Sequence, residues 1–572
     1  MRRVIGMLLV AAIVTAFAVM TADAKPQYVK ALPLDQRIKV SVGDVKQSSC
    51  TKLFAITWGA DIGTYYANGG MKTAKGSIFD NEELCFELIR QDNYRLQFEA
   101  FLKGDTAYLR MPLDSMLAAV ELLSRDSRTI PFATEQLSWS AGGDVFVAKN
   151  TVKNLCDLKA KVIVLQIDGP HVGFLARVLK DCGMTLRDVE IRWVEDLVGV
   201  EGNTPGAALR EDATVHAAIV LSPDAALLMT PTKGPESFYV PGVHTLLSTR
   251  TLDHILPDVY VVRSDYLQQK RAKVEKFVHG RLLAEEQVRA LFQNTSTPAY
   301  AALLKGAGEL FNGDLAAKEI EGLYADGKTV GYRGNVSFFT NPSDPRNFSV
   351  LGTEIQKALV SVGLITKVMA VEHAKWDYAK LAKGLVDISA AEASKFNPKE
   401  LAKHVDSMDR KGLLDKERLF VVEIPFDKDK AVVDPKNLLI RTRLLEVLER
   451  AVTYGGAGVT IEAHADVSSY LDERATGAPP DFLKKKRHVA LGLSRARAMA
   501  VKKMVVDLAE SEGLLIDPNQ FVVVGYGIEK PKTGMCGTDP CMPADDEAKQ
   551  SNRRVEFRFL EIPAESSVFA GK

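Results

Sequence analysis

The sequence predicts an α/β protein of several domains, and three features lead to this prediction. Short runs rich in valine and isoleucine alternate with amphipathic stretches, which is the pattern of strands joined by helices in a mostly parallel sheet. The chain has 572 residues, and at ~150 residues per domain this length corresponds to three or four domains or lobes. A second, separate pattern of alternating strands and helices begins near residue 418.

The first 24 residues have the three parts of a secretory signal peptide. Arg2 and Arg3 form a basic start, residues 4–20 are apolar, and Ala22-Asp23-Ala24 matches a small-residue cleavage site. The alternative is an uncleaved anchor, because the apolar stretch approaches the ~20 residues that span a bilayer. The cleavage site favours removal, so we expect an exported, soluble protein. No cysteine directly follows the site, which argues against a lipoprotein.

Charge and cysteine content narrow the possible classes of partner and of covalent cross-link. The chain has 73 basic and 73 acidic residues, a balance that gives no support for a nucleic-acid partner. Six cysteines in an exported protein favour disulfides, and their grouping suggests Cys50–Cys85, Cys156–Cys182 and Cys536–Cys541, although the sequence leaves the connectivity open. A zinc site at Cys536 and Cys541 is disfavoured by the spacing and by the lack of a nearby histidine.

The residues before 406 contain five runs that we predict as buried strands: LFAITW (53–58), VFVAK (145–149), KVIVLQI (161–167), HAAIVL (216–221) and DVYVVR (258–263). VGFLARVLKDCG (172–183) is amphipathic and ends on glycine, as helices often do. A further helical region covers about 266–325, and GNVSFFTNPSDPRNFSV (334–350) has extended and turn chemistry. Residues 25–47 form a polar lead-in, and 406–417 is the predicted linker.

The last part of the chain is predicted as a separate domain over 418–562, followed by a flexible tail over 563–572. Its strands are RLFVVEIPF (418–426), GVTIEAHAD (458–466), FVVVGYG (521–527) and NRRVEFRFLEI (552–562). Its helices are NLLIRTRLLEVLERAV (437–452), which has one apolar face, and LSRARAMAVKKMVVDLAESEG (493–513).

One carboxylate and one arginine in this domain suit a zwitterionic ligand. Asp466 ends a predicted strand, and Arg497 lies in the first turn of the next predicted helix. A guanidinium group grips a carboxylate through two parallel hydrogen bonds, while an aspartate accepts from an ammonium group. The helix N-terminus would add backbone donors. The predicted ligand is therefore an amino acid whose carboxylate and ammonium groups are both exposed.

Four motifs in this domain, EAHAD, LSRARAMAV, VVVGYGIEKP and NRRVEF, resemble the OmpA-like peptidoglycan-binding domain. The resemblance covers about 418–562 and implies that Asp466 and Arg497 hold the diaminopimelate of the cell-wall stem peptide. The chain departs from the family at Ala465, where threonine is usual, at Ala490, where asparagine is usual, and in the long stretch after Asp466. The alternative is a copy whose groove no longer binds the wall. Arg553 and Arg554 are expected at the edge of the sheet, and the alternative is that one of them lines the groove.

The residues before 406 lack the GxSxG, HExxH and P-loop motifs, so we predict no catalytic residue, metal or cofactor. Strands there are followed by small or polar residues and then a helix, as in TWGADIGTYYANGG (57–70), QIDGPHVGF (166–174) and VLSPDAALL (220–228). Such turns place backbone N–H groups at the edge of the sheet where open α/β folds bind ligands.

The order of LFAITWGAD, MPLDSMLAA, GGDVFVAKNTVKNLCDLKAK and AAIVLSPDAALL resembles the type II periplasmic solute-binding proteins of the nitrate, sulfonate and taurine ABC-transporter class. The resemblance covers about 48–405. It implies a bilobed type II periplasmic-binding-protein fold, in which two α/β lobes joined by a hinge close on a small solute. An inner-membrane ABC permease is the partner that it implies.

Loops at the strand ends would supply the solute contacts. The candidates are Trp58, Asp114, Ser115, Ser140, Gly142, Gly169, Pro170, His171, Ser222 and Asp224. Trp58 is alternatively a core residue, and Asp114, Ser222 and Asp224 are alternatively helix caps. The charge of the solute stays open, because helix N-termini favour an anion whereas Asp114 and Asp224 oppose one.

Together these features predict a periplasmic solute-binding protein that is tethered to peptidoglycan. Two other classes remain. One is an enzyme, which a reactive cysteine or histidine cluster between the lobes would support. The other is a structural or sensory envelope protein whose bilobed part binds a protein partner or no ligand. A space between the lobes too full of side chains for a solute would favour that class.

Overall fold

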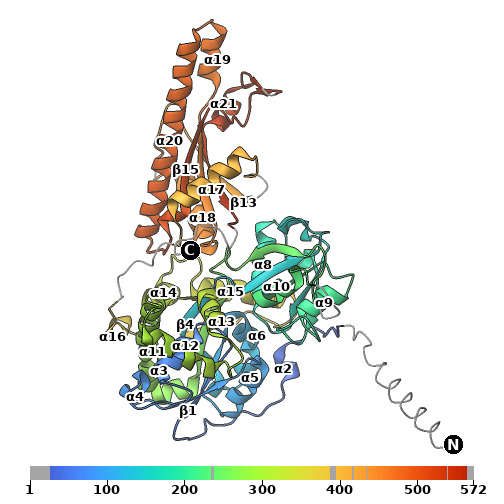
Figure 1. The fold of residues 1–572 in the computed structure, drawn as a ribbon, viewed down its shortest axis with the longest axis vertical. Helices are drawn as coiled ribbons and strands as arrows, with labels where there is room; N and C mark the ends of the chain where they lie inside the picture. Colours follow the sequence, from blue (N-terminus) through green and yellow to red (C-terminus); the bar gives the residue numbers. More distant parts are fainter. Residues whose placement is uncertain are drawn as a thin grey trace, which may run out of the picture.

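The computed structural model describes residues 26–232, 237–386, 395–414, 418–434, 436–537 and 539–562. The predicted signal peptide and the predicted tail lie outside these ranges. Two lobes form one end of the molecule, and residues after about 395 form the other (Figure 1). Within the described ranges, no helix combines the length and the apolar character needed to cross a membrane.

Lobe 1 is built on strands from distant parts of the chain. β1 (Thr51–Ala55) pairs in parallel with β2 (Phe86–Arg90), and a second sheet has the order β11-β4-β10-β3. The strands of this sheet are β3 (Tyr108–Pro112), β4 (Pro131–Ser140), β10 (Pro257–Arg263) and β11 (Gly327–Thr329), with β12 (Glu372–His373) added beside β4. The covering helices include α3 (Asp61–Asn68), α5 (Tyr94–Lys103), α6 (Leu113–Ala118) and α11 (Ser264–Gln293). Phe79, Phe86, Tyr108 and Phe277 pack edge to face or tilted in the core.

Lobe 2 has one five-stranded sheet, in the order β7-β6-β8-β5-β9. The strands are β5 (Asp144–Ala148), β6 (Val162–Gln166), β7 (Glu190–Val194), β8 (Ala217–Leu221) and β9 (His244–Ser248). Helices α8 (His171–Asp181), α9 (Pro205–Glu211) and α10 (Ser222–Met229) complete it. The predicted mostly parallel sheet is in fact mixed, because β5 runs antiparallel to both β8 and β9.

The chain crosses between the lobes twice, from β4 to β5 and from β9 to β10. We call residues 141–143 and 249–256 the first and second crossing segments. All five predicted strands of this region are present as β1, β5, β6, β8 and β10, and the predicted helix at 172–183 is α8.

The stretch after residue 325 differs from the sequence prediction. The expected extended segment at 334–350 contains α14 (Gly331–Thr340) and the start of α15 (Phe348–Ser361). Asn335 stabilises α14 against β4, donating to the Gln136 carbonyl and accepting from the Gln136 N–H. Asn347 caps α15 through the Val350 N–H. The prediction of extended structure here was wrong, because these tertiary contacts and the cap outweigh the turn residues.

The C-terminal domain has the sheet order β13-β18-β14-β15. The strands are β13 (Arg418–Pro425), β14 (Gly458–His464), β15 (Phe521–Gly527) and β18 (Arg554–Leu560), and α18 (Leu438–Thr453) and α20 (Pro480–Ser511) pack against the sheet. The predicted linker at 406–417 begins inside α17 (Pro398–Arg410). Leu401, Val405 and Met408 of α17 share a core cluster with Val522 and Leu560, so this helix packs on the C-terminal sheet.

Helix α20 begins well before the predicted position. LSRARA was expected to start a helix, but α20 already starts at Pro480, with proline at its first position. The long stretch after Asp466 forms α19 (Ser468–Ala475) and the first part of α20, which project together at the far end of the molecule (Figure 1). The remaining α-helices and strands of the described residues are α2 (Leu34–Arg37), α4 (Ile78–Asn81), α7 (Val120–Leu123), α12 (Pro298–Leu310), α13 (Ala317–Asp326), α16 (Tyr378–Leu381), α21 (Asp546–Asn552), β16 (Met535–Cys536) and β17 (Asp539–Pro540).

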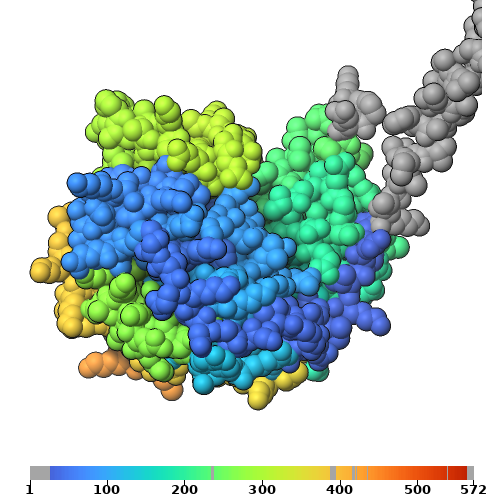
Figure 2. Space-filling view, turned by 90° about the horizontal axis from the view of Figure 1, so that it is seen from below, coloured from blue at the N-terminus to red at the C-terminus, as the bar shows by residue number. Residues whose placement is uncertain are grey.

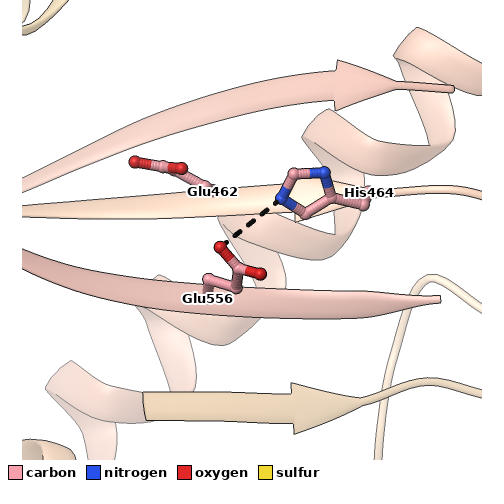
Figure 3. Close-up of side chains that lie close together, drawn as sticks. All are labelled: Glu462, His464 and Glu556. Carbon is pink, nitrogen blue, oxygen red and sulfur yellow. Dashed lines mark ion pairs between the residues drawn. The ribbon is translucent and has the colours of Figure 1, made fainter. Parts of the chain in front are cut away.

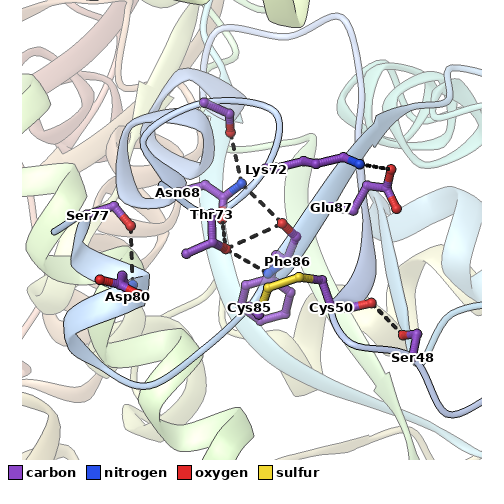
Figure 4. The surroundings of a disulfide bond; sticks show 11 residues. Ser48, Cys50, Asn68, Lys72, Thr73, Ser77, Asp80, Cys85, Phe86 and Glu87 are labelled. Carbon is purple, nitrogen blue, oxygen red and sulfur yellow. Dashed lines mark hydrogen bonds and ion pairs between the residues drawn. A yellow bond between two sulfur atoms is a disulfide. The ribbon is translucent and has the colours of Figure 1, made fainter. Parts of the chain in front are cut away.

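Three disulfides join the cysteines in the pairs that their grouping suggested: Cys50–Cys85, Cys156–Cys182 and Cys536–Cys541. The first connects the residues just before β1 and β2, beside a network in which the Thr73 hydroxyl donates to the Asn68 side chain (Figure 4). Each disulfide closes a local loop of the chain and thereby restricts the unfolded state.

The C-terminal domain packs directly on the bilobed part. The His254 N–H donates to the Thr453 carbonyl, and the Gly456 N–H donates to the Thr251 carbonyl at 3.2 Å. A Cβ at Gly456 would lie 1.6 Å from the Arg250 carbonyl oxygen, so only glycine allows this approach. The domain is therefore seated on the second crossing segment.

Helix α8 of lobe 2 adds to the same junction. The guanidinium of Arg177 makes a two-pronged ion pair with Glu449 of α18. The Tyr454 hydroxyl, just after α18, donates to Asp181. Burial and the Asp181 carboxylate raise the pKa of this tyrosine well above its usual range, so the hydroxyl stays a donor at neutral pH.

Candidate functional site

Four of the predicted solute residues come together where the lobes meet. Trp58 follows β1, and its indole N–H donates to Ser138 Oγ of β4 at 3.1 Å. A Cβ at Gly143 would lie 2.4 Å from the Trp58 ring, and the Ser222 N–H donates to the Gly143 carbonyl at 2.8 Å. Loops from both lobes therefore meet at the first crossing segment. We call this region, formed by Trp58, Ser140, Gly142 and Ser222, the interlobe site.

Asp144 connects the interlobe site to helix α8. Its Oδ2 accepts from Ser140 Oγ at 2.6 Å, and its Oδ1 lies 2.7 Å from His171 Nε2. Thr249, in the second crossing segment, bonds to Ser140 Oγ at 3.0 Å and accepts from the Asp144 N–H. His171 is only 1% exposed. The contact between His171 and Asp144 is thus a buried ion pair or hydrogen bond, and it joins the start of α8 to the residue that follows the first crossing segment.

Asp114 bridges the two lobes directly. Its Oδ1 accepts from the Gly173 N–H of α8 at 3.0 Å, although Asp114 itself belongs to α6 of lobe 1. Burial raises the pKa of Asp114 to about 8, against the opposing effect of the Gly173 hydrogen bond. Asp114 Oδ2 and the buried Ser115 Oγ find no hydrogen-bond partner among the described residues. The carboxyl group is therefore mostly protonated at neutral pH.

Three further predicted residues lie beside the interlobe site or away from it. Pro170 is the N-cap of α8, and a Cβ at Gly169 would lie 2.5 Å from Gln166 Oε1. Asp224 accepts from the Gly199 N–H at 2.9 Å, and burial raises its pKa. This contact is inside lobe 2, and the N-cap of α10 is Leu221, so Asp224 orders local backbone without serving as the helix cap that was the alternative.

The sequence analysis missed four residues of this region: Asp144, Thr249, Arg250 and Asp326. Asp144 is the third residue of the quoted stretch GGDVFVAKNTVKNLCDLKAK, and Thr249 and Arg250 directly follow β9, so polar residues at strand ends could have indicated them. Asp326 ends α13, in a region that offered only helical periodicity.

Asp466 lies just after the end of β14. Its Oδ1 accepts from the Ser468 N–H at 3.3 Å and from Ser468 Oγ at 3.0 Å. Its Oδ2 is 3.9 Å from Arg553 Nη1, and the two side chains are 14% and 15% exposed. Asp466 and Arg553 thus form an oppositely charged pair that solvent reaches.

Arg497 is placed differently from the expectation. Its residue is 0% exposed, and Nε, Nη1 and Nη2 donate to the carbonyl oxygens of Lys430, His464 and Asp427 at 2.7, 2.8 and 3.1 Å. Burial, followed by the charge of Arg553, lowers the pKa of Arg497 to about 10. Since α20 starts at Pro480, Arg497 is inside the helix, and the helix N-terminus contributes no donors beside it.

A buried polar cluster crosses the same sheet (Figure 3). One ligand atom each of Glu462, His464 and Glu556 lies within 4.8 Å of the others, which is close enough to hold a metal ion. However, Arg558 Nε lies 3.0 Å from Glu462 Oε1, and Arg554 pairs with Glu556. Burial and the charge of Arg554 lower the pKa of His464 to about 3. Two carboxylates neutralised by two guanidiniums give a cation little attraction, so this cluster fits a structural role.

Comparison with known proteins gives matches to solved structures alone. No family model matches the chain, and no curated protein matches it. The chain is similar to the periplasmic aliphatic sulphonate binding protein of Escherichia coli, with 15% identity and a TM-score of 0.39, covering 56% of this chain and 90% of that chain. It is also similar to the desulfurization enzyme DSZB, with 13% identity and a TM-score of 0.35, covering 58% and 98%.

A further similar structure is the peptidoglycan-associated lipoprotein of Burkholderia pseudomallei. The identity is 18% and the TM-score is 0.17, and the match covers 27% of this chain and 98% of that chain. The fold of the chain is mixed α/β, with helices and several sheets.

Proposed function

We propose that the chain is a periplasmic solute-binding protein that is tethered to peptidoglycan through its C-terminal domain. The observation that carries the first half is the convergence of Trp58, Ser140, Gly142 and Ser222 on the first crossing segment. Loops from two lobes that meet at a hinge can enclose a small molecule when the lobes rotate. An inner-membrane ABC permease is the proposed recipient of the solute.

Native mass spectrometry of the mature protein, purified gently and compared with a denatured sample, tests solute binding. A co-purifying small mass that disappears on denaturation supports the proposal and identifies the solute class. A bare mass, together with no thermal shift in a broad metabolite screen, would contradict it.

The tether is proposed to use the charged pair of Asp466 and Arg553. The Asp466 carboxylate accepts from the ammonium group of the diaminopimelate in the stem peptide, and Arg553 takes the carboxylate of the same residue. The support for this assignment is the solvent-accessible pair of Asp466 and Arg553. Arg497 holds the backbone at residues 427, 430 and 464, because its donors are directed at the carbonyls there.

Co-sedimentation with purified sacculi tests the tether. Asp466→Asn should reduce the bound fraction strongly, because an amide is a poor partner for an ammonium group. The control is Asp472→Asn, on an exposed position of α19. Equal sedimentation of Asp466→Asn and wild type would exclude this charged pair as the tether.

One observation favours a second candidate function, that of a structural or sensory envelope protein. Asp114, Ser140 and His171 are buried and bonded to neighbouring protein groups, so the space between the lobes is filled around them. The metabolite screen separates the two candidates, since this second function predicts no response to any solute.

A further inference from the structure

The chain places one of its own carboxylates in the interlobe site. Asp326 ends α13, and its Oδ1 lies 3.1 Å from Arg250 Nη2, which belongs to the second crossing segment. The Asp326 carbonyl accepts from the Ala141 N–H of the first crossing segment at 2.7 Å. Burial raises the pKa of Asp326 above its usual range, against the opposing charge of Arg250 and a side-chain hydrogen bond from Ser222 at the start of α10. One residue thus contacts both crossing segments and the first residue of a lobe 2 helix.

The partners of this carboxylate are those that an anionic ligand would use. Arg250 supplies a guanidinium that is 37% exposed, and the first turn of α10 supplies positive partial charge. Two acidic residues near this site oppose an anion: Asp144, which is bonded to Ser140 and His171, and Asp224 in the first turn of α10, which accepts from the Gly199 N–H inside lobe 2. Arg250 is the cation with which an anionic group would pair.

Glycines allow residues 323–327 to lie close to the loops of the interlobe site. A Cβ at Gly142 would lie 2.4 Å from Asp326 Oδ1, and a Cβ at Gly59 would lie 2.1 Å from the Leu323 carbonyl oxygen. Residues 327–329 continue as β11 and pair with β4 at Ser138–Ser140. Residues 323–327 are thus in contact with the loops after β1 and β4, two of the loops that the sequence predicted for solute binding.

The part of the chain that contains residues 323–327 is visible on the surface. In Figure 2 the yellow-green part of the chain, which includes α12 and α13, stands beside the green part of lobe 2, and the surface is notched between them. Asp326 is 19% exposed and Arg250 is 37% exposed. Solvent therefore reaches the ion pair, and an incoming anion could compete for Arg250.

We propose that residues 323–327 are an internal plug, which fills the interlobe site with the Asp326 carboxylate until an organic anion displaces it. This inference rests on the proposed solute-binding function. A ligand of this kind must carry a carboxylate or a similar anionic group that pairs with Arg250. Binding then requires the plug to leave, so the apparent affinity is reduced by the fraction of molecules in which the plug is seated.

Acetate is the appropriate probe, because it is the side chain of aspartate as a free anion. The full-length mature protein is compared as wild type, Asp326→Ala and Asp326→Asn, with acetate binding followed by saturation-transfer NMR and by thermal shift. We expect Asp326→Ala to bind acetate about tenfold more tightly than wild type. Asp326→Asn preserves the shape of the segment and controls for unfolding, and it should show a smaller gain.

Two further variants make the test specific. Asp314→Ala removes an aspartate whose side chain is 66% exposed, and it should bind acetate as wild type does. Arg250→Gln in the Asp326→Ala background should abolish the gain. The inference is overturned if Asp326→Ala binds acetate no better than wild type, or if the gain survives loss of Arg250.

Failure of the plug and failure of solute binding give different results. A solute found by native mass spectrometry that binds wild type and Asp326→Ala equally well overturns the plug and leaves the binding function standing. The opposite result is also distinguishable. If Asp326→Ala binds acetate and this binding depends on Arg250, the plug is supported, even if a metabolite screen on wild type and Asp326→Ala overturns the solute-binding proposal.

Discussion

Replacing Arg497 by methionine should damage the C-terminal fold, whereas replacing Arg553 by glutamine should damage wall binding. The Arg497 guanidinium serves three backbone carbonyls, of which the contact to His464 is fully buried and the other two are partly buried. An unsatisfied buried acceptor costs about 1–3 kcal/mol, while water can partly replace the other two bonds, so we expect a loss of about 3 kcal/mol.

Hydrogen exchange of β14 is the suitable assay for this loss. The four tryptophans, Trp58, Trp139, Trp193 and Trp376, all precede the C-terminal domain, so tryptophan fluorescence would not report on it. A loss of about 3 kcal/mol corresponds to roughly 100-fold faster exchange where opening is global to the domain. For Arg553→Gln we expect a change of at most about 1 kcal/mol, since its ion pair is reached by solvent.

Sacculus co-sedimentation completes the comparison. Arg553→Gln should sediment poorly while keeping the exchange protection of β14. The reasoning is refuted if Arg497→Met keeps full protection of β14 and loses only wall binding. In that case Arg497 would contact the stem peptide, as the resemblance to the OmpA-like family implied.

The other predictions concern the lobes and the junction. Asp114 has a raised pKa in the fold, so the folded protein retains a proton that the unfolded chain releases above about pH 4. As the pH rises from about 4 to 8, wild type should therefore lose up to about 1.4 kcal/mol of stability per pH unit relative to Asp114→Asn. Melting temperatures of both proteins across this pH range would show the difference. If the two melting temperatures change with pH in parallel, the raised pKa of Asp114 is contradicted. Glu449→Gln removes the partner of Arg177, which is only 5% exposed, and should weaken the junction by about 1–2 kcal/mol, seen as faster proteolysis between the domains. Gly456→Ala should cost about 1–3 kcal/mol because its Cβ would overlap the Arg250 carbonyl, and an unchanged melting temperature would show that the loop can move aside.

The sequence predicted the elements of this fold better than their ends. Val- and Ile-rich runs with flanking turn residues are sufficient to place β5, β6 and β8, because buried strands need little beyond apolar, β-branched side chains. The start of α20 was misplaced by 13 residues: Leu493 was expected, and the helix begins at Pro480. The lysine-rich stretch before it gives no apolar stripe, and a helix that projects into solvent needs none on most of its surface.

The candidate sites show the same limit. The place of Asp466 just after β14 could be predicted, because a carboxylate after an apolar strand is a local feature of the sequence. The burial of Arg497 could not, because its acceptors at 427, 430 and 464 are brought together only by the folded sheet and its loops. Asp326 was missed for the same reason, since it reaches Arg250 over 76 residues of chain.

The seat of the C-terminal domain on residues 250–256 has a mechanical consequence. A wall anchor attached to the end of one lobe would act as a lever, and each movement of the wall would pry the lobes apart. The C-terminal domain, which we propose as the anchor, is seated at the pivot through Gly456 and also holds helix α8 of lobe 2 through Glu449. A pull at the pivot would act with a short lever arm, whereas a rotation of lobe 2 would have to break the ion pair between Arg177 and Glu449.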